Sequence, residues 1–194
     1  MIQRTPHQFV SVVDYLRLQE ASEQRLEYLD GEVRAMAGGT FAHGDIGRNM
    51  VRQLDEQLEL RGSRCSAMNG DIRIYVESYS SFVYPDAAVV CGDRKVAEPD
   101  EHAYTNPTLV VEVLSKSSAG YDRGDKFKKY CSLPSFQEYV LIEQRRPEVD
   151  VLYRRSSREW SMITYRSLAD TVRLVSIGLD IPMRAIYRSV RFGE

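Results

Sequence analysis

The chain has 194 residues, of which 43% are hydrophobic and 28% charged, and its formal net charge is −2. This length and balance are those of one globular domain with a proper core. The net charge disfavours a protein that coats nucleic acid, because such binding depends on Lys and Arg neutralising phosphates. No apolar run reaches the roughly 20 residues that span a bilayer, and residues 1–7 lack the apolar segment of a signal peptide. We therefore expect a cytoplasmic protein without a membrane partner.

Three cysteines, Cys65, Cys91 and Cys131, are far apart in the sequence. Their number is odd, and they form neither a CxxC pair nor a disulfide framework. We expect all three to be reduced packing residues of a cytoplasmic protein, and we expect no zinc site.

The N-terminal third carries clear local signals. Residues 11–20 open with a capping-box pattern and predict a helix. Residues 26–36 predict a β-hairpin that turns at Asp30-Gly31. Apolar residues at helical spacing predict the longest amphipathic helix over 43–60, and Gly62 ends it.

The remainder predicts a sheet with one further helix. The candidate strands cover residues 64–68, 71–76, 87–90, 108–114, 138–142, 149–154, 160–164 and 171–175. The most apolar of them, 108–114, is expected to be central. Residues 92–106 predict an exposed polar loop, and 122–132 a helix. This order favours one α/β domain over residues 1–194, with a mixed β-sheet flanked by helices and an antiparallel C-terminal β extension.

Two carboxylates interrupt the apolar strands. In residues 108–114 the side chains alternate between faces, which places Glu112 near the carboxyl end, where ligand sites of α/β sheets gather. The alternative for Glu112 is an exposed edge strand. Asp86 follows Pro85 and by itself predicts only a turn. Taken with Glu112 on the next apolar strand, it brings two carboxylates to one Mg²⁺ or Mn²⁺, a hard ion that prefers oxygen ligands.

A lysine on the following helix is the candidate cation of this site. Lys126 lies four residues after Asp122 and four before Tyr130, so the three share a helix face. Lys126 either forms a surface pair with Asp122 or reaches the metal-bound water and the charge that develops on the phosphate. The rival lysines are Lys116, Lys128 and Lys129.

Other polar residues are weaker candidates. Asp71 is either a third acidic ligand or, more simply, a turn residue. His43 fits a capping or packing role, and His7 and His102 fall in surface segments. With three histidines in the chain, a Ser-His-Asp triad or a histidine metal centre is not expected.

Several motifs together resemble one family. They cover residues 25–33, 36–40 with His43, 84–86, 106–115, 121–127 with Tyr130, and 138–142. In these stretches the chain resembles the Uma-type family of predicted bacterial endonucleases, within the PD-(D/E)XK (restriction endonuclease-like) nuclease superfamily.

The resemblance implies a restriction endonuclease-like core with Asp86 and Glu112 as magnesium ligands, completed by the main-chain carbonyl of Val113. The superfamily lysine stands two residues after the glutamate, where this chain has Leu114. The family resembled here supplies its lysine from the next helix, which implies Lys126 as the third catalytic residue. The supporting candidates are Asp71, Tyr130 and His43.

The activity so implied is metal-dependent hydrolysis of DNA phosphodiesters by an endonuclease. Without metal, repulsion between Asp86 and Glu112 should raise at least one of their pKa values. A homodimer would suit a cut in both strands of a duplex. Two alternatives stay open. One is a weak or inactive nuclease-fold protein that binds nucleic acid or a protein partner, and the other is a toxin-like component that needs a partner chain.

Overall fold

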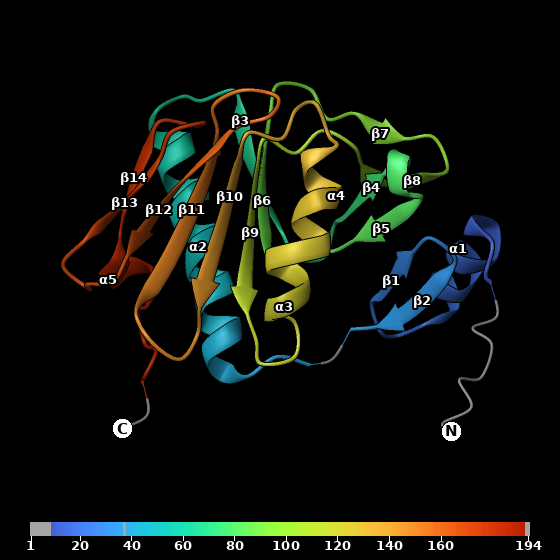
Figure 1. The fold of residues 1–194 in the computed structure, drawn as a ribbon, viewed down its shortest axis with the longest axis horizontal. Helices are drawn as coiled ribbons and strands as arrows, with labels where there is room; N and C mark the ends of the chain where they lie inside the picture. The colour runs from blue at the N-terminus through green and yellow to red at the C-terminus, as the bar shows by residue number, and fades with distance from the viewer. Residues whose placement is uncertain (1–8, 37, 193–194) are drawn as a thin grey trace.

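The computed structural model describes residues 9–36 and 38–192 (Figure 1). The predictions for residues 1–7, His7 included, lie outside this range. The helical elements are α1 (Val12–Ala21), α2 (Phe41–Leu60), the 3₁₀ turn η1 (Glu77–Tyr79), α3 (Ala119–Tyr121), the π-helical turn η2 (Asp122–Lys126), α4 (Phe127–Cys131) and α5 (Met183–Ile186). No helix in the described ranges is long and apolar enough to cross a membrane.

The strands form two larger sheets and a hairpin. The main sheet has the order β12 (Trp160–Tyr165), β11 (Glu148–Arg154), β10 (Glu138–Glu143), β9 (Leu109–Leu114), β6 (Ala87–Cys91) and β3 (Cys65–Asn69). The second has the order β2 (Glu32–Ala35), β1 (Leu26–Leu29), β5 (Ser81–Val83), β4 (Arg73–Val76), β8 (Asp100–Tyr104) and β7 (Val96–Ala97). The hairpin pairs β13 (Thr171–Leu174) with β14 (Leu179–Pro182).

The main sheet lies between two helical layers (Figure 1). Helix α2 covers one face, where its buried Ile46 and Met50 pack in one apolar cluster with Val111 of β9. The continuous helical segment α3–η2–α4 covers the other face, where Tyr130 packs with Leu114. β9 is central and buried along its whole length, as predicted. β9 runs parallel to β10 and antiparallel to β6, so the sheet is mixed.

The local N-terminal signals are confirmed. The Ser11 side chain caps α1 by accepting from the Asp14 amide. Asp30 (φ 48°) and Gly31 (φ 92°) form the tight turn between β1 and β2, which is the conformation that Asp-Gly favours in hairpins. Gly62 (φ 57°) follows the end of α2 in the left-handed conformation expected of a C-terminal glycine.

The prediction of an exposed loop over residues 92–106 is wrong. This segment contains β7 and β8, and Tyr104 is buried. β8 pairs in parallel with β4, and Asp100 at its start forms a buried ion pair with Arg73. A strand of sequence DEHAY has no apolar period of its own, so partners distant in sequence decide its structure. The helix predicted over 122–132 begins earlier, at Ala119, and includes the π-helical turn.

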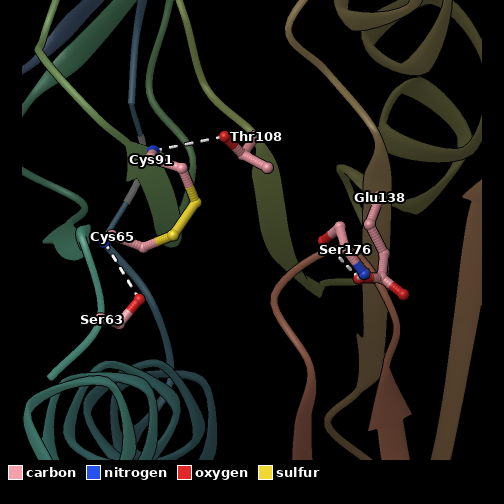
Figure 2. Close-up of a disulfide and its surroundings, with 6 residues drawn as sticks. All are labelled: Ser63, Cys65, Cys91, Thr108, Glu138 and Ser176. Atoms are coloured by element: carbon pink, nitrogen blue, oxygen red, sulfur yellow. Dashed lines mark hydrogen bonds between the residues drawn. A yellow bond between two sulfur atoms is a disulfide. The ribbon is translucent and has the colours of Figure 1, made fainter. Parts of the chain in front are cut away.

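The prediction of three reduced cysteines is also wrong. Cys65 and Cys91 form a disulfide between β3 and β6 (Figure 2). The Cys65 amide donates to the Ser63 hydroxyl, and the Cys91 amide donates to the Thr108 hydroxyl. The two cysteines stand directly opposite in the register. They are 26 residues apart in sequence, and only the strand pairing brings them together. Cys131 is a free, half-buried thiol, and burial raises its pKa to about 11.

Candidate active site

Asp86 and Glu112 come from neighbouring strands of the main sheet. Ala87 pairs with Val111, so Asp86, one position before, lies level with Glu112, one position after. The Asp86 amide donates to the Val111 carbonyl (3.1 Å), and the Val113 amide donates to Asp86 Oδ2 (2.6 Å). The sheet register therefore brings together the two carboxylates that the sequence singled out.

Glu112 is buried and faces the helical layer. It is 3% exposed and belongs to the central strand, so the edge-strand alternative is wrong. Lys126 Nζ lies 2.9 Å from Glu112 Oε1, and the Tyr130 hydroxyl donates to the same oxygen at 3.0 Å. Both contacts fall on Oε1. Within the described ranges, Oε2 has no hydrogen-bond partner and remains for a ligand.

Lys126 is held at the centre of an acidic cluster. It is 4% exposed, and Nζ donates to the Tyr84 carbonyl at 2.9 Å. Glu27 Oε1 lies 3.5 Å from Nζ and Asp122 Oδ1 lies 3.9 Å away. The interpretation as a surface pair with Asp122 is therefore wrong, because both partners are buried.

The rival lysines lie elsewhere. Lys128 pairs with Asp125 at 3.0 Å on the exposed surface. Lys129 lies over the rings of Tyr79 and Tyr121. Lys116 lines the cavity described below. Of the four lysines considered, the structure places Lys126 against Glu112.

The electrostatic balance of the site is acidic. Burial raises the pKa of Glu112 well above its ordinary value; Lys126 opposes this, while Asp122 and Asp86 add to it. Burial acts to lower the pKa of Lys126, but the carboxylates of Glu112, Glu27 and Asp122 outweigh it and the pKa lies well above its ordinary value. The sequence predicted that repulsion between Asp86 and Glu112 would raise a carboxyl pKa. The pKa of Glu112 is raised, but burial contributes more to the shift than the repulsion does.

The His43 side chain contacts Asp86, so its role goes beyond the predicted capping or packing. Its Nε2 lies 2.8 Å from Asp86 Oδ1, while Nδ1 is buried without a hydrogen-bond partner among residues 9–36 and 38–192. The hydrogen bond to Asp86 raises the pKa of His43. α2 positions this ring, because Thr40 caps the helix by accepting from the His43 amide.

Two contributors were not found from the sequence. Glu27 reaches Lys126 from β1, and Gln144 links the Thr40 hydroxyl (2.5 Å) to the Leu114 carbonyl (2.8 Å). Glu27 lies inside a motif of the resemblance, which was its only signal, and nothing local marks Gln144. Asp71 is exposed and pairs with Arg25 at 3.4 Å.

These groups line one cavity of about 1120 Å³. Its lining comes from the carboxyl end of β9, the start of α2 and the segment that leads into α3, and these elements lie close together in Figure 1. Asp86, Glu112 and Lys126 are part of its lining, and Asp71 also borders it. The cationic lining residues are Arg25, Arg48, Arg52, Lys116, Lys126 and Arg145. Carboxylates and cationic side chains therefore both line the cavity.

Residues 12–184 match the sequence profile of the Uma2 family, described as "Putative restriction endonuclease". The chain belongs to this family. It is 33% identical over 189 residues to the uncharacterized protein slr1290 of Synechocystis sp. (strain ATCC 27184 / PCC 6803 / Kazusa), covering 96% of both chains. It is 32% identical over 151 residues to the uncharacterized protein sll1609 of the same organism, covering 78% of this chain and 84% of the relative.

The fold of this Uma2-family protein matches a solved structure. The crystal structure of "a putative nuclease belonging to DUF820" from Anabaena variabilis ATCC 29413 aligns with a TM-score of 0.73 and 16% identity, covering 92% of this chain and 97% of that one. This likeness confirms the predicted restriction endonuclease-like fold, a mixed sheet flanked by helices. The predicted family is confirmed by the profile match.

The Uma2-family site suits a hard divalent cation. No group of three or more His, Cys, Asp or Glu side chains in the described part of the chain is arranged to hold a metal. Mg²⁺, however, commonly takes one or two carboxylates and completes its shell with water and substrate phosphates. Asp86 and Glu112 supply such a pair, with Glu112 Oε2 available. The oxygen donors therefore fit Mg²⁺ or Mn²⁺ better than a zinc centre of Cys and His.

Proposed function

We propose that this Uma2-family protein is a Mg²⁺-dependent endonuclease that hydrolyses DNA phosphodiester bonds in the cavity above Asp86 and Glu112. The observation that carries the proposal is the buried Lys126 ammonium, 2.9 Å from Glu112 and fixed by the Tyr84 carbonyl. It supplies the cation that Leu114 does not. Two carboxylates can hold the metal that assists phosphodiester hydrolysis, and the lysine beside them can stabilise the charge that develops.

Each residue of the site has a role that follows from its position. Asp86, Glu112 and the Val113 carbonyl would hold Mg²⁺, which when bound supplies a Lewis acid and lowers the pKa of a coordinated water. Lys126, whose pKa is raised, is charged at neutral pH. It therefore serves to steady the attacking water or the charge that builds up on the phosphate, not as a general base. Tyr130 orients Glu112 through its hydroxyl.

His43 and the Val113 amide act on Asp86 from two sides. His43 Nε2 contacts Oδ1, and the Val113 amide donates to Oδ2. These contacts fix the carboxylate plane at the cavity. Since the side chain of Asp86 is 22% exposed, it remains accessible to an ion from the cavity.

The test combines cleavage with metal binding. Nicking of supercoiled plasmid DNA is measured with Mg²⁺, Mn²⁺ or EDTA for wild type, Asp86→Asn, Glu112→Gln and Lys126→Met. Removing one group that stabilises transition-state charge costs about 10²–10³ in rate, so we expect losses of that order. The matched controls, Asp125→Asn and Lys128→Met, change an exposed acid and lysine of the same helical segment and should keep wild-type activity.

Calorimetric titration with Mg²⁺ decides between the alternatives. Binding should be lost in Asp86→Asn and Glu112→Gln while circular dichroism shows a folded chain. A folded wild type that neither binds Mg²⁺ nor cuts DNA would refute the proposal and favour a nuclease-fold protein that only binds nucleic acid or a protein partner. The homodimer and the cytoplasmic location remain predictions, and sedimentation velocity tests the first.

A further inference from the structure

Two of the proposed reacting groups are buried in the lining of the cavity. Glu112 is 3% exposed and Lys126 is 4% exposed, so a scissile phosphate must enter the cavity to reach them. Duplex DNA is stiff on the scale of a protein and keeps its bases stacked inside. An unpaired strand can bend into a pocket and present a single phosphate and its base. The depth of the site therefore favours unpaired nucleotides.

An exposed aromatic ring borders a cavity beside the candidate active site. Phe41, the first residue of α2, is 96% exposed. It borders a second cavity of about 610 Å³, which shares four of its lining residues with the first: Gly39, Thr40, Gly44 and Arg48. Single exposed apolar residues are common on protein surfaces, but this one borders a cavity that adjoins the candidate active site. A free phenyl face there is the kind of platform on which a base stacks.

Two arginines follow Phe41 on the same face of α2. Arg48 and Arg52 follow at seven and eleven residues, on the same side of α2. A Cβ added at Gly44 or Gly47 would meet no atom within 4 Å, so the helix surface between them is open. Exposed pairs with Asp45 (2.7 Å) and Glu56 (3.4 Å) hold the two guanidinium groups, and phosphates can replace such weak surface partners.

Two further cations line the same cavity. The side chains of Lys116 and Arg145 form no ion pair or hydrogen bond with the described part of the chain, and both border the cavity. Together with Arg48 and Arg52 they complement a phosphate backbone. A stacking ring followed by a basic groove is the arrangement that proteins use to bind single strands.

We propose that this groove binds unpaired nucleic acid, with Phe41 stacking on a base as the strand enters the cavity. The inference rests on the proposed nuclease function and narrows its substrate class to single-stranded or locally unpaired nucleic acid. Phe41 is a binding residue for the strand, and Arg48, Arg52, Lys116 and Arg145 are its phosphate partners.

Binding without cleavage tests this. Fluorescence anisotropy in EDTA compares a labelled single strand of about 16 nucleotides, the upper site size of one such groove, with its duplex. One stacked base contributes about 1–3 kcal/mol, so Phe41→Ala should weaken single-strand binding by about 5- to 150-fold and leave duplex binding nearly unchanged. Phe41→Trp should retain single-strand binding and quench a 2-aminopurine base. Leu60→Ala, at the other end of α2 and also exposed, is the matched control.

The outcomes separate the two proposals. Wild-type single-strand affinity in Phe41→Ala, or equal losses for single strand and duplex, would overturn the proposed single-strand binding. Plasmid nicking would still test the proposed nuclease activity independently. A protein that binds single strands through Phe41 but never cuts DNA keeps the inference and loses the proposed activity. A wild type that binds no oligonucleotide overturns both. Because Phe41 is almost fully exposed, its replacement leaves the core intact, and circular dichroism confirms the fold.

Discussion

Replacing Lys126 with methionine should strongly destabilise the protein at neutral pH. The change keeps the chain length but leaves Glu112, Glu27 and Asp122 without the ammonium that now lies 2.9, 3.5 and 3.9 Å from them. Removing one partner of a buried ion pair costs about 3–5 kcal/mol, a large part of the 5–15 kcal/mol by which native proteins are typically stable.

The loss should shrink at acidic pH, because a proton can replace the missing cation on Glu112. Burial already raises the pKa of this carboxyl above its ordinary 4.5, and removing Lys126 raises it further. A folded pKa above the unfolded one means that ionisation is penalised in the folded state. The penalty is therefore absent below pH 4.5 and grows as pH rises to the folded pKa. We expect a smaller deficit at pH 5 than at pH 8.

Urea unfolding, followed by the fluorescence of the lone tryptophan, Trp160, measures these free energies. Lys128→Met removes an exposed lysine and should leave the free energy of unfolding close to that of wild type. The double variant Lys126→Met with Glu112→Gln should be more stable than Lys126→Met alone at pH 8, because no buried charge remains on Glu112. A loss below about 1 kcal/mol that does not vary with pH would refute the buried acidic cluster around Lys126.

Three further predictions concern stability. Cys65→Ser with Cys91→Ser should lower the free energy of unfolding by about 2–4 kcal/mol, and dithiothreitol should do the same to wild type only; an unchanged urea midpoint would contradict the disulfide. The arginine side chains beside Glu148 hold its pKa at about 2, below its ordinary 4.5. The stability that ionised Glu148 contributes is therefore complete above pH 4.5 and is lost as pH falls toward 2. Glu148→Gln should flatten the acid dependence of the free energy of unfolding, and an unaltered dependence would contradict this prediction. Leu54→Ala, in the core face of α2, should cost about 2–5 kcal/mol, whereas the exposed Leu60→Ala should cost little, and similar losses for both would contradict the assigned face.

The features that the sequence predicted correctly are those that neighbouring residues determine. The apolar period of α2, the Asp30-Gly31 turn and the alternation of β9 each lie within one segment. Glu112 could be assigned to the helical face because alternation in β9 is strict. Four-residue spacing put Lys126 on one helix face with Asp122 but left a surface pair possible, and only the family resemblance pointed to Lys126 as the lysine of the site.

The features that were missed depend on register between distant segments. The disulfide joins residues that only the pairing of β3 and β6 brings together. Gln144 meets Thr40 across 104 residues, and Glu27 reaches Lys126 from the other sheet. Each of these polar side chains resembles an ordinary surface residue in its local sequence. Only the folded chain shows which partners these side chains meet.

In the proposed site, Leu114 occupies the position of the usual superfamily lysine. A lysine two residues after Glu112 would share its strand face, and Leu114 on that face is buried in the apolar cluster with Tyr130. The ammonium instead arrives from the helical layer that covers this face.

The packing of that layer therefore decides the geometry of the site. The Tyr139 hydroxyl donates to the Asp122 carbonyl at 3.0 Å, and its ring stacks on Phe127, which ties the π-helical turn to β10. Lys126 lies in this turn between Asp122 and Phe127. Such turns occur frequently at functional sites. In a strand-borne site the register alone would fix the lysine, whereas here the contact between helix and sheet must fix it.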